Sequence, residues 1–425
     1  MRRISCRVAL LGVLLVSCKG GGGTAPPVAS SSAAAVAVAA PTASPPGALS
    51  PEGCLTAPDY LVPLQKYGDN DLIRAVLVDG DQVFFRNMRD LMRVPLSGGP
   101  VVPVGKAPAL SLRGTTELWS AGDELLTQSS GEPIFMKSKK SGGEWTSFID
   151  LTAAKKGGGR DVATRILQGI GRASPPAATA AAFDGKAFYY AEITRGKGRN
   201  APSASVLKSV ALGGGEPRTL FETPGDISEV TVAGDQLAFH LVLPPTAEQL
   251  AKAEADRKKN KFAFGVSGEN WLMAVPLAGG AGKRLMRLSS IFSGGLMGTS
   301  TILGADGSTL YVSGYADEDL TKPGVYRLAA AGGAPEQLDK RFLRGNAYVA
   351  GDRIVIVATG TVEPGKPAHA ALVLTVPRQG KSLTLAACVA QDSSLHASAL
   401  AGNTVLLSLF QQGARIAGIA KVALK

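Results

Sequence analysis

A short motif that recurs along the chain constrains the fold more than any other feature of the sequence. Each copy places Gly next to Asp or Asn and continues into an apolar run. Such turn residues are typical of β-hairpins, because Gly, Asn and Asp tolerate the positive φ angles that tight turns demand. The seven copies begin at Val78, Ala121, Phe183, Ala233, Ala305, Ala350 and Ala401. We therefore expect a hairpin unit that is repeated about seven times.

A second motif follows most of these turns at a similar offset. Residues 91–99 (LMRVPLSGG) closely match residues 272–280 (LMAVPLAGG), and looser versions span 208–214 and 326–333. A Gly-Gly turn then leads into another short apolar run, as at residues 101–104. Each unit therefore contains four short predicted strands, and the turn glycines of the compact units lie 42 to 51 residues apart. This length and strand count are typical of a β-propeller blade.

These repeats predict an all-β fold, a β-propeller of about seven four-stranded blades, with six or eight blades left open. The last unit has only three strands, and residues 60–64 are predicted to supply the fourth and close the ring. The units resemble the repeats of bacterial TolB-type propellers, in which a Gly/Asp turn and an apolar run precede a PL-x-GG segment. This resemblance covers most of the chain, and it implies a fold but no activity.

The first 18 residues have the pattern of a bacterial secretion signal. Arg2, Arg3 and Arg7 precede an uncharged apolar stretch at residues 8–16, which is too short to span a bilayer. The next residues, Leu-Val-Ser-Cys at 15–18, resemble the lipobox of bacterial lipoproteins. This resemblance implies cleavage before Cys18 and acylation of that cysteine, including palmitate. An ordinary cleaved signal with an incidental cysteine is the alternative.

Residues 18–50 are predicted to form a disordered tether. They contain no aromatic residue and, past Lys19, no charge, so they cannot bury enough apolar surface to offset the entropy of ordering. The predicted organisation is a signal peptide at 1–17, the tether at 18–50 and the propeller at 51–425. The expected location is the cell envelope, with the lipid bilayer as a partner through acylated Cys18. In Gram-negative lipoproteins, an aspartate directly after the lipidated cysteine retains the protein in the inner membrane. Lys19 occupies that position here, so the outer membrane is expected if the source is Gram-negative.

Two of the four cysteines remain in the predicted propeller, Cys54 and Cys388. An exported compartment permits disulfides. Ring closure by residues 60–64 would place Cys54 beside the last blade and Cys388 in the outer strand of the blade before it. We therefore predict a disulfide between them, with two unpaired cysteines as the alternative.

Insertions in the repeats predict a binding surface on one rim of the ring. In a four-stranded blade, the loop between the second and third strands and the connection to the next blade share one rim, and nearly all insertions fall there. Loops on a rigid scaffold often provide function, although drift in tolerant loops is the alternative. The longest insertion, 244–269, begins with a capping box at 246–249 and is predicted to form a helix to about Lys259. The candidate binding residues are charged side chains of these loops: Arg195, Lys197, Arg199, Arg257, Lys258, Lys259, Lys261, Asp317, Glu318, Asp319, Lys322 and Lys366.

The charge of the chain indicates the kind of partner. Without the three signal arginines it has 42 basic and 34 acidic residues, a balance that favours a protein or an anionic polymer. Nucleic acid is not expected as a partner of an exported protein. The main hypothesis is thus a membrane-anchored lipoprotein whose propeller is a binding or scaffolding module.

A propeller enzyme, a hydrolase or lyase with acidic residues around the central channel, is the alternative function. The sequence offers little for it. The three histidines, His240, His369 and His396, fall in different blades and have no metal-binding spacing. There is no G-x-S-x-G elbow and no phosphate-binding loop. No catalytic residue, metal site or cofactor is predicted.

Overall fold

The structure is a computed structural model of the chain, which divides into two units, residues 1–43 and 44–425. All residues that the structure describes belong to the second unit. They are residues 54–55, 58–66, 72–87, 90–106, 118–129, 134–150, 177–195, 203–259, 268–288, 301–315, 322–341, 343–361, 369–389, 393–411 and 414–424. The predicted signal peptide, the tether and Cys18 lie outside them. No helix in this part of the chain is long and apolar enough to cross a membrane.

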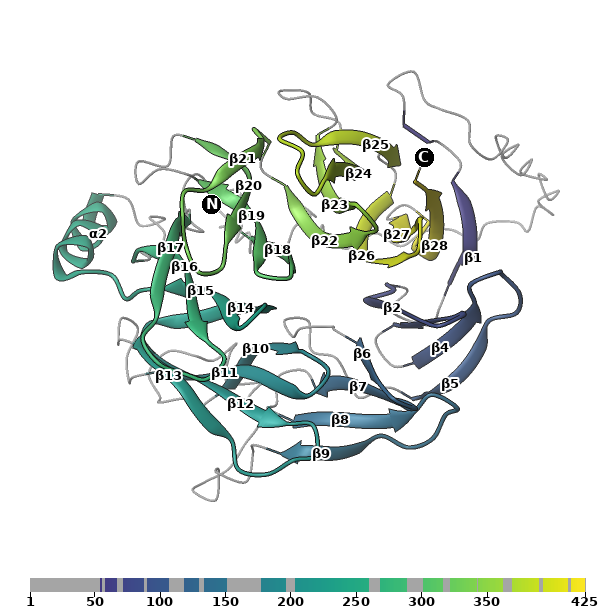
Figure 1. The fold of residues 1–425 in the computed structure, drawn as a ribbon, viewed down its shortest axis with the longest axis horizontal. Coiled ribbons are helices and arrows are strands. Elements are labelled where there is room, and N and C mark those ends of the chain that lie inside the picture. Colours follow the sequence, from purple (N-terminus) through teal and green to yellow (C-terminus); the bar gives the residue numbers. More distant parts are fainter. Residues whose placement is uncertain are drawn as a thin grey trace, which may run out of the picture. The chain divides into compact units, whose positions relative to one another are not determined.

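The described residues form seven four-stranded antiparallel sheets that follow one another around a ring (Figure 1). The innermost strands of successive blades contact one another, for example β14 with β18 and β18 with β22. The structure therefore confirms the predicted seven-bladed β-propeller with four strands in each blade.

The strands of the first four blades run outward from the channel in chain order. Blade 1 contains β2 (Ala75–Asp79), β3 (Gln82–Arg86), β4 (Asp90–Pro95) and β5 (Val102–Lys106). Blade 2 contains β6 (Leu118–Ala121), β7 (Glu124–Ser129), β8 (Ile134–Lys139) and β9 (Thr146–Asp150). Blade 3 contains β10 (Ala177–Phe183), β11 (Ala187–Arg195), β12 (Ser203–Ala211) and β13 (Arg218–Pro224). Blade 4 contains β14 (Asp226–Ala233), β15 (Gln236–Val242), β16 (Asn270–Pro276) and β17 (Lys283–Leu288), with helix α2 (Ala247–Lys259) between β15 and β16.

The last three blades follow the same order, except that blade 7 takes its outer strand from the start of the chain. Blade 5 contains β18 (Thr301–Asp306), β19 (Thr309–Tyr315), β20 (Pro323–Ala329) and β21 (Glu336–Asp339). Blade 6 contains β22 (Arg344–Ala350), β23 (Arg353–Thr361), β24 (His369–Pro377) and β25 (Thr384–Val389). Blade 7 contains β26 (Ser393–Ala401), β27 (Thr404–Gln411), β28 (Ile416–Ala423) and β1 (Asp59–Gln65).

The hydrophobic core lies between neighbouring blades. Strand β27 shows why the second strand of each unit is apolar on both faces. Leu406 belongs to the cluster shared with blade 1, whereas Val405 and Leu407 belong to the cluster shared with blade 6. Because successive residues of a strand point to opposite faces, a strand between two blades must be apolar throughout.

The turns between the first and second strands have the geometry that the sequence predicts. Gly80 and Gly122 both adopt φ angles of +59°, in the left-handed region that favours glycine. Hydrogen bonding is interrupted more often at the outer strands. The pairing of the third with the fourth strand shifts register in blades 1 to 6, as between Leu272 and Met273, and such β-bulges increase the local twist.

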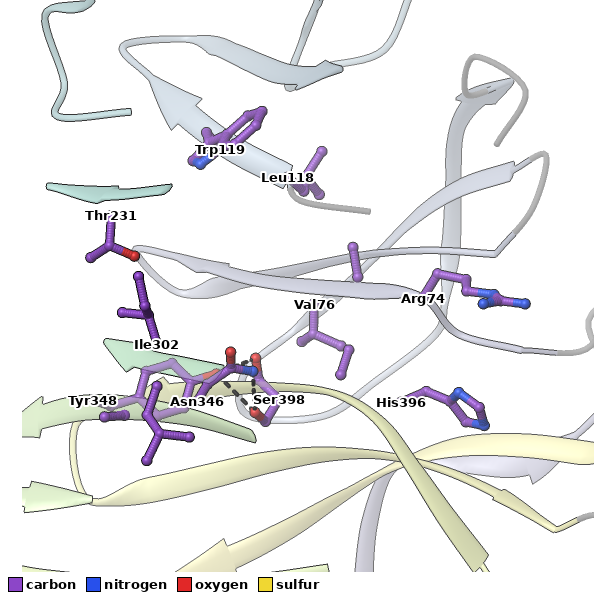
Figure 2. A pocket seen from close by; sticks show the side chains of 14 residues that line it. Arg74, Val76, Leu118, Trp119, Thr231, Ile302, Asn346, Tyr348, His396 and Ser398 are labelled. Carbon is purple, nitrogen blue, oxygen red and sulfur yellow. Dashed lines mark hydrogen bonds between the residues drawn. The ribbon is translucent and has the colours of Figure 1, made fainter. Parts of the chain in front are cut away.

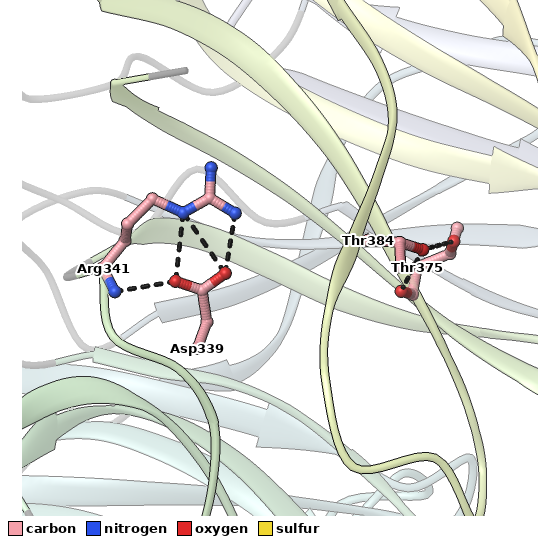
Figure 3. Close-up of polar contacts among 4 residues, drawn as sticks. All are labelled: Asp339, Arg341, Thr375 and Thr384. Atoms are coloured by element: carbon pink, nitrogen blue, oxygen red, sulfur yellow. Dashed lines mark hydrogen bonds and ion pairs between the residues drawn. The ribbon is translucent and has the colours of Figure 1, made fainter. Parts of the chain in front are cut away.

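Polar contacts also hold the outer and connecting segments. At the end of blade 5, the carboxylate of Asp339 accepts a hydrogen bond from the backbone N–H of Arg341 and pairs with its guanidinium, at 2.6 Å between Oδ2 and Nη2 (Figure 3). On the outer strands of blade 6, the Thr384 hydroxyl donates to the carbonyl of Thr375 at 3.1 Å. Such local bonds satisfy backbone groups where the regular ladder ends.

The ring closes through strands from the two ends of the chain, as the sequence predicts. Strand β1 pairs with β28, with Asp59 opposite Lys421 and Tyr60 opposite Ala420. The preceding residues reach the adjacent blade, because the backbone N–H of Leu55 donates to the carbonyl of Cys388 at 2.7 Å. Cys54 and Cys388 form a disulfide across the same contact, with their Cα atoms 4.6 Å apart. Residues 54–55 and 58–65 thus join blades 6 and 7, and we call them the N-terminal clasp.

One buried hydroxyl makes a stability test of this core possible. The Tyr190 side chain is fully buried, burial raises the pKa of its phenol, and its hydroxyl has no hydrogen-bond partner among the described residues. An unsatisfied buried polar group costs about 1–3 kcal/mol, so we expect Tyr190→Phe to raise the free energy of unfolding by about 1 kcal/mol. Urea denaturation of the two proteins measures this difference.

Tyr326→Phe is the matched control for this substitution. The Tyr326 hydroxyl donates to the carbonyl of Lys322 at 2.5 Å and accepts from the amide of Gln337 at 3.0 Å. Its removal should lower the free energy of unfolding by about 1 kcal/mol. An equal decrease in the free energy of unfolding of Tyr190→Phe would show that the Tyr190 hydroxyl has a hydrogen-bond partner.

Candidate functional site

Helix α2 lies in the longest insertion that the sequence predicts. The sequence predicts a helix here, and the structure places one at Ala247–Lys259, at the outer side of blade 4 (Figure 1). Its first turn is closed by the predicted capping box. The backbone N–H of Gln249 donates to the Thr246 hydroxyl at 3.2 Å, and the backbone N–H of Thr246 donates to the Gln249 side-chain carbonyl at 2.8 Å.

The structure describes only part of the predicted binding face. Lys258 is exposed on α2, with its ammonium 3.9 Å from the carboxylate of Glu254. Lys322 is exposed directly before β20, and the backbone of Arg195 ends β11. The structure does not describe the side chains of three further members, Arg195, Arg257 and Lys259. The other seven members lie wholly outside the described residues: Lys197, Arg199, Lys261, Asp317, Glu318, Asp319 and Lys366. The binding face therefore stays a prediction.

A cavity of about 580 Å³ lies among the innermost strands. Its described lining comes from β14, β18, β22 and β26, from β6, and from β2 with the residue before it (Figure 2). The lining residues are Arg74, Ala75, Val76, Leu118, Trp119, Thr231, Ile302, Leu303, Asn346, Ala347, Tyr348, His396, Ala397 and Ser398. The cavity therefore collects side chains from six of the seven blades around the channel of the propeller.

One wall of the cavity carries a hydrogen-bonded group of three side chains, joined by dashed lines in Figure 2. The hydroxyl of Tyr348 donates to the carbonyl of Ser398 at 2.7 Å and lies 2.8 Å from its hydroxyl. The amide of Asn346 donates to the same hydroxyl at 3.3 Å. These bonds link β22 of blade 6 to β26 of blade 7, so the wall is fixed by two blades rather than by a loop.

Arg74 and His396 bring charge and a titratable ring to the cavity. Burial lowers the pKa of the Arg74 guanidinium. The His396 ring is exposed to the cavity, and yet its pKa lies below the usual value, first because the surrounding protein desolvates the charged form and second because of the nearby charge of Arg74. Because both causes disfavour the charged form, His396 is neutral at neutral pH.

The alternative function predicts acidic residues around the channel. No described lining residue of the cavity is Asp or Glu. Glu229, on the inner strand β14, has a φ of +51° and accepts a hydrogen bond from the backbone N–H of Ile302 at 2.9 Å. That carboxylate joins blade 4 to blade 5.

A second polar group is buried inside blade 4. Nδ1 of His240 lies 3.3 Å from the Ser228 hydroxyl, and Nε2 lies 3.2 Å from the side-chain carbonyl of Asn270. His240 is 2% exposed, and burial lowers its pKa. This arrangement is that of a satisfied core histidine. Among the described residues, no three His, Cys, Asp or Glu side chains form a set that could hold a metal ion.

The cavity residues are functional candidates that the sequence reasoning missed. Arg74, Trp119 and Tyr348 lie in or beside the first strand of their units, ahead of the Gly/Asp turns. The repeats identify those strands as the innermost ones. Polar and aromatic residues in these strands were therefore the available signal for a site at the channel. The predicted binding face included loop residues alone.

Comparison with known proteins gives the fold. No protein-family model matches the chain, and no curated protein matches it in sequence. An oligogalacturonate lyase in complex with manganese is similar in structure, with a TM-score of 0.53 and 12% identity, over 86% of this chain and 97% of that one.

Two further solved structures extend this comparison. A puromycin-hydrolysing peptidase from Mycobacterium tuberculosis has a TM-score of 0.52 and 12% identity, over 85% of this chain and 51% of that one. TolB from Acinetobacter baumannii has a TM-score of 0.35 and 11% identity, over 82% of this chain and 79% of that one, which is too low to support kinship. At such identities the likeness shows the β-propeller fold alone, a fold that proteins of different activities share.

Proposed function

We propose that this protein is an exported lipoprotein, anchored by acylated Cys18, whose propeller binds a protein or an anionic polymer through the rim that carries the insertions. The observation that supports this most is α2. Residues 243–269 separate β15 from β16 and include a capped helix, whereas β3 and β4 are separated only by residues 87–89. An insertion with its own ordered element on a rigid ring is suited to recognition.

The preference for an anionic partner depends on the basic excess of the sequence. The described exposed side chains of α2 carry both signs, Lys252 and Lys258 as well as Glu248, Glu254 and Asp256. Exposed cations attract a partner of opposite charge and raise its rate of association more than its final affinity. We therefore expect the interaction to weaken as salt is added, because the screening length falls to about 8 Å at physiological ionic strength.

A hydrolase or lyase is the second candidate. The lyase and the peptidase of similar structure show that this fold is used by enzymes, but likeness at 12% identity brings no activity to this chain. The described cavity wall offers one imidazole and no carboxylate. General acid–base chemistry needs a suitably placed proton donor and acceptor, and a hard divalent ion prefers several oxygen ligands. Binding therefore ranks before catalysis.

A pull-down from crosslinked cells tests the rim. The intact protein is compared with a variant in which residues 246–261 are replaced by a short Gly/Ser loop. We expect a partner that the intact protein captures and the variant loses, and that added salt weakens. The matched control is Lys139→Gln, which removes an exposed cation at the end of β8, on the opposite rim.

Two results would contradict the rim proposal. A partner that both the intact protein and the loop variant retain would place the binding surface elsewhere. No partner in either sample, with the protein intact and correctly located, would favour a screen for hydrolase and lyase activity instead.

A further inference from the structure

The outer wall of blade 4 carries a concentration of positive charge. Its outer strand β17 contains Lys283, Arg284 and Arg287, and it is the only described outer strand with three basic and no acidic residues. Strand β17 pairs with β16, which begins directly after the insertion that contains α2. This charge therefore lies next to the rim through which we propose that the protein binds its partner.

Both arginines of β17 contact one aromatic ring. Trp271 on β16 lies opposite Arg287, and Arg284 reaches the same face because the pairing of the two strands shifts by one residue between them. The guanidinium carbons of Arg284 and Arg287 lie 4.8 Å and 5.1 Å from the centroid of the Trp271 ring. These distances are those of cation–π contacts. A guanidinium that stacks on a ring keeps its N–H donors in its own plane, where they can bind an anion.

The two arginines differ in their other contacts. Arg287 pairs with Glu269, with 2.8 Å between Nη1 and Oε1. Arg284 is exposed and forms no ion pair with any carboxylate that the structure describes. Its contact with Trp271 thus orients a guanidinium whose donors can still bind a ligand. Because the side chain is already held, an anion can bind it with a small loss of conformational entropy.

Glu269 adds a negative group beside these cations. Its carboxylate also accepts a hydrogen bond from the indole N–H of Trp271 at 3.0 Å. Hydrogen bonds from Arg287 and Trp271 lower the pKa of Glu269, so this group is charged at neutral pH. Its side chain is 40% exposed, so it can accept further hydrogen bonds from a ligand. A complementary ligand therefore carries an anionic group for Arg284 and hydrogen-bond donors for Glu269.

We propose that the anionic partner of the rim is an acidic polysaccharide, whose charged groups bind Arg284 while its sugar hydroxyls donate hydrogen bonds to Glu269. A charged sugar presents hydroxyl donors next to its anionic group, so it matches both residues. An acidic peptide matches them less well, because ionised Asp and Glu side chains only accept hydrogen bonds and would meet Glu269 with like charge. This inference rests on the proposed rim interaction and names the chemistry of its partner.

The three tryptophans of the chain allow a site-specific test. Full-length protein in a neutral detergent, labelled with 5-fluorotryptophan, gives one fluorine resonance for each of Trp119, Trp145 and Trp271, assigned by single Trp→Phe variants. The charged probes are an alginate hexasaccharide, matched by its methyl ester, and a sulfated dextran hexasaccharide, matched by its unsulfated form. We expect one charged probe or both to shift the Trp271 resonance and to leave that of Trp119, which lines the central cavity, in place. If only one binds, it identifies the anionic group as a carboxylate or a sulfate.

The expected affinities separate recognition by Arg284 from nonspecific contact. The uncharged form of a probe should bind at least about tenfold more weakly than its charged form, because it loses a charge-assisted hydrogen bond. Arg284→Gln should weaken the charged probe by a similar factor, and Arg284→Lys should fall between the two, because it keeps the charge but loses the planar set of donors. Lys106→Gln is the control, because Lys106 is exposed on the outer strand β5 of blade 1 and pairs with Asp90 at 2.6 Å. The affinity of this control should equal that of the unmodified protein.

Four outcomes would overturn the polysaccharide proposal. The first three are no shift of the Trp271 resonance with either charged probe up to about 10 mM, equal affinities for charged and uncharged forms, and unchanged affinity in a folded Arg284→Gln protein. The fourth is equal or tighter binding of hexaglutamate, which would make the partner an acidic peptide. The comparison of charged with uncharged probes uses the unmodified chain, so it remains decisive even if the Arg284 variants do not fold.

Failure of this proposal can be distinguished from failure of the rim interaction. If the pull-down partner depends on residues 246–261 and neither charged probe binds, the rim interaction stands and the polysaccharide is wrong. If the partner is retained without residues 246–261 and a charged probe still shifts the Trp271 resonance, the saccharide site stands without the rim interaction.

Discussion

Replacing Cys54 and Cys388 together by alanine is expected to lower the free energy of unfolding by about 2–4 kcal/mol. The disulfide closes a loop of 334 residues, for which the chain-entropy treatment gives about 6 kcal/mol, and measured values are commonly smaller. Both cysteines are buried, at 3% and 1% exposed, so alanine is preferred to serine, which would bury a hydroxyl. Denaturant unfolding of the two proteins measures the difference.

Hydrogen exchange locates the effect of the same variant. Loss of the disulfide should increase exchange first in the N-terminal clasp and in β28, because β28 is the only described strand with which β1 pairs. Chemical reduction of the unmodified protein should reproduce the loss of stability. An unchanged denaturation midpoint after complete reduction would show that the disulfide does not stabilise the ring and that the pairing of β1 with β28 is sufficient to close it.

Replacing Cys18 by alanine is expected to move nearly all of the protein from the membrane fraction to the soluble fraction. Two or more acyl chains anchor a protein stably, whereas this chain has no other predicted anchor. Cell fractionation, labelling with palmitate and mass spectrometry of the N-terminal peptide measure the change. Cys6→Ala is the matched control, because Cys6 lies in the predicted signal peptide and leaves with it.

The same experiment distinguishes a lipoprotein from a protein with an ordinary cleaved signal. An unacylated mature N-terminus, or equal membrane association with and without Cys18, would rule out the lipid anchor. Cys18 lies outside the described residues, so this prediction depends on the sequence pattern alone.

Much of the fold could be predicted from local sequence. The Gly/Asp turns and the Gly-Gly turns specify backbone conformations that few other residues adopt, so they mark hairpins without any knowledge of tertiary contacts. Closure by residues 60–64 followed from the missing strand of the last unit. Helix α2 could be predicted because Thr246 and Gln249 satisfy each other's backbone groups within one turn.

The cavity could not be predicted in the same way, because its residues come from strands far apart in the sequence. Alternation along a strand also fails to show which side chains reach the channel. The inner strands β14 and β26 both shift register against their partners, between Ser228 and Val230 and between Leu395 and Ala397. One extra residue reverses the face of every residue after it. His396 lies at such a shift and Thr231 lies after one, so alternation alone does not predict that they line the cavity.

Closure by strands from both ends of the chain also sets the order of events in biosynthesis. Among the described strands β1 is made first and β28 last, and a bond between them, such as the ion pair of Asp59 with Lys421 at 2.9 Å, cannot form until both exist. While the intervening blades are synthesised, β1 lacks its partner strand. A product truncated before residue 416 has no β28 to receive it, so an incomplete chain keeps an open ring.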